Sequence, residues 1–114
     1  MVLPPLVKKR AEKYFHSYCE RKVPLHVRNK VRLTFGFRGN SLTLYEEREG
    51  FFDKTTWTKS PVAQFRYRPE SGEWTLYCRD RNLRWFQYSY ARPTNHLEGL
   101  IGTIDADVTG IFWG

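Results

Sequence analysis

The hydrophobic residues near the start of the chain recur every three or four positions, at Val7, Ala11, Tyr14 and Tyr18, with Phe15 beside them. This spacing predicts a helix that packs one face against the rest of the protein and keeps its charged face in water. Pro4-Pro5 suits the first turn of such a helix. Pro24 ends it, because proline disfavours helix at the residue before it.

After Lys30 the hydrophobic spacing changes to two, with Val31, Leu33, Phe35 and Phe37 alternating with Arg32, Thr34, Gly36 and Arg38. This alternation is typical of a half-buried strand. Gly39-Asn40 follows as a two-residue hairpin loop, since both residues tolerate positive φ. The hairpin pairs Phe37 with Leu42 and places Arg32 opposite Glu47 as a cross-strand ion pair.

Three further strands are expected from the same alternation, at residues 62–68, 74–79 and 83–88. Residues 50–60 have no clear period and are expected to form a loop with aromatic anchors. The last strand has an uncertain register, because a slip of one residue in the turn before it exchanges the faces of Trp85 and Phe86.

A second helix is expected near the end of the chain, where Leu97, Leu100, Ile101 and Ile104 share one helical face. Asn95 and Glu98 have capping-box spacing at its start. The order predicts an α+β fold, with an antiparallel meander sheet of about five strands between an N-terminal and a C-terminal helix. We expect a single domain over residues 1–114.

The composition fits one small domain with a packed core, since the 114 residues (13.6 kDa) are 40% hydrophobic. No apolar run approaches the roughly 18 residues of a membrane span, so we expect no membrane association. The start lacks the features of a signal peptide, and Cys19 and Cys78 are too few for a disulfide scaffold. We therefore expect a soluble, cytoplasmic protein.

Positive charge is concentrated in parts of the chain. The net charge is +7, yet residues 1–38 carry ten basic and two acidic side chains, whereas residues 93–114 carry three acidic and no basic ones. An anionic partner would select for such asymmetry, and nucleic acid is the commonest. A solvated surface kept soluble by its charge would look the same.

One face of the predicted sheet combines basic and aromatic side chains. Its candidate nucleic-acid-binding residues are Arg66, Arg68, Tyr77, Arg79, Arg84 and Trp85, with Phe86 in place of Trp85 in the other register. Basic groups neutralise phosphates while aromatic and guanidinium planes stack on bases. The same mixture occurs on ordinary exposed sheets, or one of the helices could cover this face. The Lys8–Lys13 segment would add electrostatic attraction.

Two other features suggest metal chemistry only weakly. Residues 105–110 (Asp-Ala-Asp-Val-Thr-Gly) match the first half of a calcium loop but lack the glutamate at the twelfth position, so a helix end turned by Gly110 is the simpler interpretation. Glu46-Glu47 with Asp80 could form a nuclease-like acidic cluster, which makes a metal-dependent hydrolase a third functional class. We predict no metal site, no cofactor and no identifiable catalytic residue.

The histidines and cysteines suggest no site either. None of the histidines, His16, His26 and His96, has a second ligand at metal spacing. Cys19 and Cys78 are expected to be buried structural thiols. The alternative to nucleic-acid binding is a protein-interaction or homodimerisation module, which would use Trp57, Phe51-Phe52 or the apolar tail at residues 111–113. We expect the tail to pack on the core.

Residues 60–107 resemble the arm-site DNA-binding domains of tyrosine recombinases. The resemblance rests on Gly72-Glu73-Trp74, Arg79-Asp80-Arg81-Asn82 and the amphipathic helix that follows. It implies a sheet that enters the major groove, but as a general pattern it remains an analogy.

Nearly the whole chain resembles a family of short bacterial proteins known only as a domain of unknown function. The segments that carry this resemblance are Pro24-Leu25-His26-Val27-Arg28, Arg38-Gly39-Asn40-Ser41, Trp57-Thr58-Lys59-Ser60-Pro61, Trp74-Thr75-Leu76-Tyr77, Asp80-Arg81-Asn82 and the closing Gly110-Ile111-Phe112-Trp113-Gly114. The chain departs from the family pattern at Leu83, where glycine is usual, and at Phe86, where histidine is common. The resemblance implies a free-standing small protein and brings no activity and no catalytic residues.

Overall fold

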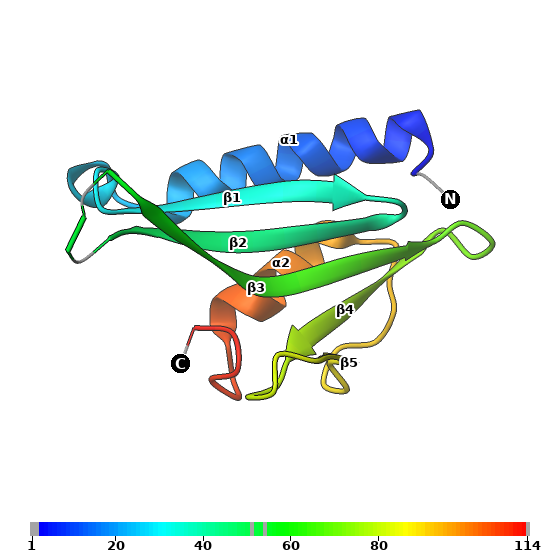
Figure 1. The fold of residues 1–114 in the computed structure, drawn as a ribbon. Helices are drawn as coiled ribbons and strands as arrows, with labels where there is room; N and C mark the ends of the chain where they lie inside the picture. Colours follow the sequence, from blue (N-terminus) through cyan, green and yellow to red (C-terminus); the bar gives the residue numbers. More distant parts are fainter. Residues whose placement is uncertain (1–2, 51, 54, 114) are drawn as a thin grey trace.

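Five antiparallel strands form one sheet in sequence order, and a helix lies at each end of the chain (Figure 1). The computed structural model describes residues 3–50, 52–53 and 55–113. The elements are α1 (Pro5–Lys22), a short 3-10 turn η1 (Leu25–Val27), β1 (Val31–Arg38), β2 (Ser41–Glu49), β3 (Trp57–Arg68), β4 (Glu73–Arg79), β5 (Trp85–Gln87) and α2 (Leu97–Ala106). The predicted α+β meander is confirmed.

Helix α1 is attached to the sheet mainly through Phe15. Its side chain is fully buried, with its ring centre 5.8 Å from that of Phe35 on β1 and 4.9 Å from that of Phe65 on β3. Ala11 and Tyr18 are buried on the same helical face. The helical spacing of these residues therefore gives α1 one apolar side, which packs against the sheet.

The β1–β2 hairpin has the predicted register. Gly39 takes a φ of 60°, as the two-residue loop requires, and Arg32 lies opposite Glu47. The Arg32 Nη2 atom is 2.9 Å from Glu47 Oε1, and the Thr34 hydroxyl donates to Glu47 Oε2 at 2.6 Å. The hydrogen bond from Thr34 and the nearby guanidinium hold the pKa of Glu47 below its usual value.

Strand β3 begins at Trp57, five residues before the predicted start, so the expectation of a loop over residues 50–60 was wrong for residues 57–60. The reason is a β-bulge, since Leu44 pairs with Ala63 but Tyr45 pairs with Pro61, which leaves Val62 unpaired. A bulge interrupts the period of two, so the sequence pattern hid the first half of the strand. Phe51 lies outside the described residues.

Strand β5 is shorter than predicted, because Leu83 lies in the turn with a φ of 63°. The pairing of Cys78 with Phe86 and of Arg79 with Trp85 resolves the two registers. Paired residues share a face, so Trp85 lies on the same face as Arg79 and Phe86 on the same face as the buried Cys78.

Helix α2 has the predicted apolar face, with Leu97, Leu100, Ile101 and Ile104 all buried. The predicted capping box was wrong. The N-cap residue is His96, one residue after Asn95, and no side chain caps this end of the helix.

The chain turns after the end of α2, with Gly110 at a φ of 73°, as the helix-end interpretation predicted. The two carboxylate oxygens of Asp107 accept hydrogen bonds from the backbone N–H groups of Phe112 and Trp113. Asp105 accepts hydrogen bonds from Tyr18 and Lys22 of α1. Phe112 is buried, so the tail packs on the core. The aspartates of the calcium-like motif therefore join parts of the fold.

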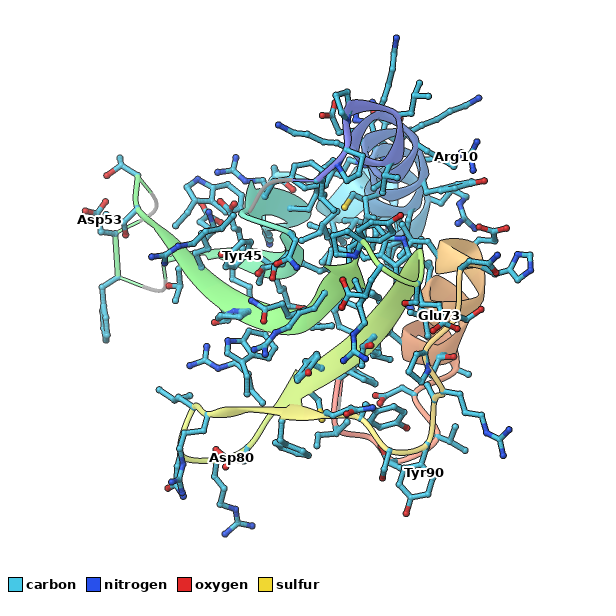
Figure 2. All side chains as sticks on the ribbon, turned by 90° about the vertical axis from the view of Figure 1, so that its right-hand side faces the viewer. Arg10, Tyr45, Asp53, Glu73, Asp80 and Tyr90 are labelled. Atoms are coloured by element: carbon cyan, nitrogen blue, oxygen red, sulfur yellow. The ribbon has the colours of Figure 1, made fainter. Side chains whose placement is uncertain are left out.

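Both helices pack on the same face of the sheet (Figure 2). The strand residues under them are Leu33, Phe35, Leu42, Leu44, Ala63, Phe65, Trp74, Leu76 and Cys78. We call the opposite side of the sheet the outer face. Within the described residues neither helix covers it. No helix in this part of the chain is long and apolar enough to cross a membrane.

Candidate nucleic-acid interface

The outer face is built from the alternate positions of the strands. Neighbouring strands align these positions in rows, and one row consists of Arg38, Ser41, Arg66 and Thr75. The next row consists of Gly36, Thr43, Gln64, Tyr77 and Gln87. Because these two rows hold no aliphatic side chain, this part of the outer face differs sharply from the core face.

Cations lie over aromatic rings at four places on this face. The pairs, with the distance from the cation to the ring centre, are Arg32 over Trp57 (4.0 Å), Lys59 over Tyr45 (4.2 Å), Arg66 over Tyr77 (3.8 Å) and Arg79 over Trp85 (5.4 Å). Such pairs contribute roughly 0.5–1 kcal/mol each where they are exposed. They distribute cations and flat aromatic rings across the sheet from β1 to β5.

Arg66 is held in place by a chain of side-chain hydrogen bonds. Its Nε donates to Gln64 Oε1 at 2.7 Å, and Gln64 in turn donates to the Thr43 hydroxyl at 3.0 Å. This chain of bonds holds the guanidinium over the ring of Tyr77, with its carbon 3.8 Å from the ring centre. A shallow hollow of about 350 Å³ lies beside it, lined by Asn40, Arg66, Tyr67, Arg68, Pro69, Glu70, Thr75 and Tyr77.

Arg68 and Arg79 are placed differently from Arg66. Arg68 is exposed at the end of β3, where its Nε lies 3.8 Å from a carboxylate oxygen of Glu70. Arg79 donates from Nε and Nη2 to the carbonyl oxygen of Leu83, so it also holds the β4–β5 turn. Arg66, Arg68, Tyr77, Arg79 and Trp85 thus all belong to strands at outer-face positions.

Arg84 is not brought together with the other candidates. It lies one residue before Trp85, the first residue of β5. Its backbone N–H donates to Asp80 Oδ1, and its carbonyl oxygen accepts from the backbone N–H of Asp80. Its guanidinium Nε lies 3.8 Å from Asp80 Oδ2, in the turn. The prediction could not place both Arg84 and Trp85 on one face, because adjacent strand residues point to opposite sides. Lys8–Lys13 belong to α1, which packs on the side of the sheet opposite the outer face.

The structure adds outer-face residues that the sequence-based prediction missed. Arg38 lies in the same row as Arg66, and the predicted hairpin already put it at an outer-face position. The other additions are Arg32, Tyr45, Trp57 and Lys59. The bulge in β3 hid Trp57 and Lys59, so the sequence pattern carried no signal for them.

The acidic side chains do not form the predicted alternative site. Glu47 is paired with Arg32 and Glu46 with Arg48, while Asp80 lies in the β4–β5 turn. Hydrogen bonds from backbone N–H groups of the turn hold the pKa of Asp80 below its usual value, and the bond from Arg84 has the largest effect. Among the described residues, no group of three or more histidine, cysteine, aspartate or glutamate side chains is placed to hold a metal ion.

The two thiols have the environment of structural cysteines. Burial raises the pKa of Cys19 to about 11 and also raises the pKa of the fully buried Cys78. Because the thiolate is the reactive species, neither residue has the properties of a nucleophile at neutral pH.

A family described as "Domain of unknown function (DUF3024)" matches residues 3–114. The chain belongs to this family. No curated protein and no solved structure matches the chain. The family resemblance inferred from the sequence motifs is therefore confirmed, while the resemblance to arm-site DNA-binding domains stays a prediction. Membership in DUF3024 assigns no role to any residue, so the function of the outer face has to be argued from its chemistry.

Proposed function

We propose that this protein binds nucleic acid through the outer face of its sheet and performs no catalysis there. The observation that carries the proposal is the Arg66–Tyr77 stack on a face that neither helix covers. A guanidinium lying flat on a ring offers its own plane to a base and its N–H groups to a phosphate. Arg68 lies two residues after Arg66 on β3, and Arg38 lies in the same row as Arg66 with Ser41 of β2 between them.

The arrangement suits an unpaired strand better than a duplex. Bases of a single strand can lie on flat side chains, whereas a duplex keeps its bases stacked on one another and presents phosphates and groove edges. The cation–aromatic pairs supply flat groups at intervals from β1 to β5, and most charged groups around them are basic. A single-stranded oligonucleotide is therefore the ligand of choice for a test.

The experiment measures the fluorescence anisotropy of a labelled single-stranded oligonucleotide at low and at high salt. Affinity should fall as salt rises, because bound phosphates release counterions. Replacing Arg66 and Arg68 by alanine should weaken binding at least about tenfold at low salt, while the far-UV circular dichroism stays unchanged. Equal affinity in the double variant would exclude this face.

A control variant of equal charge is available on α1. Lys9→Ala and Lys13→Ala together remove the same two positive charges from the exposed side of the helix, away from the outer face. If binding depends on the outer face, the control should lose much less affinity than the Arg66/Arg68 variant. If both variants lose the same affinity, the protein attracts nucleic acid only through its overall charge.

Protein–protein interaction is the second candidate, and Phe52 favours it. This residue is 97% exposed in the segment between β2 and β3. An apolar side chain of this size and exposure can take part in a contact surface. Sedimentation of the wild type and of Phe52→Ser tests this candidate. If copies of the protein associate through Phe52, the variant should dissociate and have a lower sedimentation coefficient than the wild type.

A cytoplasmic location accords with the two free cysteines.

A further inference from the structure

The sheet opens between β3 and β4. Their ladder runs from Arg68 and Glu73 to Gln64 and Tyr77 and ends there, although β3 extends back to Trp57 and β4 on to Arg79. In Figure 2 the two arms diverge, one toward the labelled Asp53 and the other toward the labelled Asp80. Between them lies a hollow of about 420 Å³, which is within the usual size range of small-molecule sites.

The lining of this hollow is divided between apolar and charged groups. Val62, the bulge residue, and Phe112, from the C-terminal tail, are both buried and lie with Ile111 on the apolar side. The charged groups of the lining are two cations, Lys59 and Arg79, and the carboxylate of Asp80. Both cations also belong to cation–aromatic pairs of the outer face. The hollow is therefore continuous with the proposed nucleic-acid interface.

Leu83, which lines the hollow, has two unfavourable features, a strained backbone and an exposed apolar side chain. Its φ of 63° is a left-handed conformation, which is unfavourable for a residue with a Cβ atom, and its side chain is 68% exposed. The turn is tightly bonded, because the backbone N–H of Leu83 donates to the Asp80 carbonyl and Arg79 donates to the Leu83 carbonyl. Burial of the side chain offsets little of this strain, because most of the side chain is exposed. Strained residues of this kind are often found at functional sites, and contact with a ligand would give Leu83 such a role.

Beside the hollow, β3 has a backbone N–H and a backbone C=O that do not bond to β2. Gly50 donates to the carbonyl of Thr56, and the antiparallel alternation then directs the hydrogen bonds of Thr58 and Ser60 toward β2. The N–H and C=O of Lys59 therefore point away from β2. The ladder between β3 and β4 ends at Gln64, and among the described residues the backbone hydrogen bonds outside the helices and strands do not involve Lys59. Such a donor and acceptor side by side match the polar edge of a nucleobase.

We propose that this hollow holds one unstacked base of a bound single strand. The base would contact Leu83 and the apolar side formed by Val62 and Ile111, while Lys59 and Arg79 face its phosphates. This inference rests on the proposed function, because it assigns a base-binding pocket to the same interface. It assigns Leu83 the role of a base-contacting residue.

The test uses nuclear magnetic resonance of the methyl groups of the intact protein. The probes are an oligonucleotide of about ten uridines and an abasic strand of the same length. At saturation the uridine strand should shift the methyl signals of Leu83, Val62 and Ile111, and the abasic strand should leave them nearly unchanged. Leu25 and Val108 are exposed methyl-bearing controls outside this lining.

The outcomes separate the two proposals. If the oligonucleotide binds with salt-dependent affinity but the methyl signals of the hollow stay in place, the pocket is overturned and the proposed function stands. If shifts occur equally with the abasic strand, the hollow binds phosphate and not a base, and the inference is again overturned. If no oligonucleotide binds at all, both proposals fail.

A variant of Leu83 adds a second measurement that does not depend on folding of the core. Leu83→Asn keeps an exposed side chain that tolerates the left-handed conformation of the turn, and it removes the apolar contact without adding a charge. We expect it to lower the affinity for the uridine strand by about fivefold or more, because the base loses its apolar contact with Leu83. For the abasic strand, the matched comparison is Leu25→Asn, which makes the same exchange elsewhere. The two variants should bind that strand alike.

Discussion

Arg66 and Tyr77 are diagonal neighbours across β3 and β4, with the guanidinium carbon 3.8 Å from the centre of the ring. In the ladder Arg66 is paired with Thr75, and Tyr77 is paired with Gln64. Diagonal contacts of this kind are within reach of long and aromatic side chains and stabilise a sheet. The same contact places a flat cation on the outer face, so stability and the proposed ligand binding involve the same two residues.

Variants of Tyr77 separate these two roles. Tyr77→Phe keeps the ring, so we expect the free energy of unfolding to stay within about 0.5 kcal/mol and the oligonucleotide affinity to be retained. Tyr77→Leu removes the stacking partner of Arg66 and should cost about 1 kcal/mol of stability and about fivefold or more in affinity. Denaturant unfolding and anisotropy titration provide the two measurements. Equal affinity in the Phe and Leu variants would contradict the stacking role.

The pKa of Glu47 makes a prediction about acid stability. Its folded pKa lies below its ordinary value of 4.5, so its contribution is present above about pH 4.5 and is lost as the pH falls through the folded pKa. Glu47→Gln should lower the free energy of unfolding by about 1–2 kcal/mol at pH 7, because the bonds from Arg32 and Thr34 lose their charged acceptor. Denaturant unfolding between pH 7 and pH 3 measures this difference, which should shrink as the pH falls. A constant difference would show that the carboxylate charge contributes nothing.

The sequence predicted best where a local rule determines the geometry. Gly39-Asn40 sets the loop of the β1–β2 hairpin, and the loop length then determines every pair down to Arg32 and Glu47. Hydrophobic spacing likewise predicted the buried faces of both helices. These features depend on residues that are close in sequence or on a fixed period.

The remaining features depend on interruptions of the period. Val62 shifts the register of β3 by one residue, which concealed Trp57 and Lys59 and with them a large part of the candidate site. Leu83 takes a left-handed φ although its type disfavours it, so β5 was predicted to begin too early. Arg84 was therefore assigned to a strand, whereas it lies in the turn beside Asp80. Neither exception has a signature in the residue types themselves.

The strain at Leu83 predicts an unusual order of stability for two substitutions. At most positions alanine is more stable than glycine, because glycine loses more conformational freedom on folding. At a φ of 63° the order should reverse, and Leu83→Gly should be more stable than Leu83→Ala by roughly 0.5–1 kcal/mol. Denaturant unfolding of the same pair at Leu25, an exposed leucine with negative φ, is the control and should give the ordinary order. The ordinary order at both positions would mean that the turn stores no strain.

Thiol reactivity checks the structural role of the cysteines. With a pKa of about 11, Cys19 is a thiolate in only about one molecule in a thousand at pH 8, and Cys78 is fully buried. Native protein should therefore react with an aromatic disulfide reagent much more slowly than unfolded protein, for both residues. Cys19→Ser leaves Cys78 as the single thiol, so its reaction rate shows which of the two thiols of the wild type reacts more slowly. Rapid reaction of native Cys19 would instead indicate an activated thiol.

The turn at the end of α2 yields the last prediction. Asp107 has a φ of 44°, and its two oxygens hold the backbone of Phe112 and Trp113. Asparagine tolerates this conformation and keeps one acceptor, whereas alanine keeps none, so Asp107→Ala should lose about 2 kcal/mol of stability and Asp107→Asn clearly less. Unfolding followed by tryptophan fluorescence measures both losses, because Trp113 lies in the affected tail. Millimolar calcium should leave the melting temperature of the wild type unchanged, since these oxygens already accept hydrogen bonds. A rise in melting temperature with calcium would restore the metal-loop interpretation of this segment.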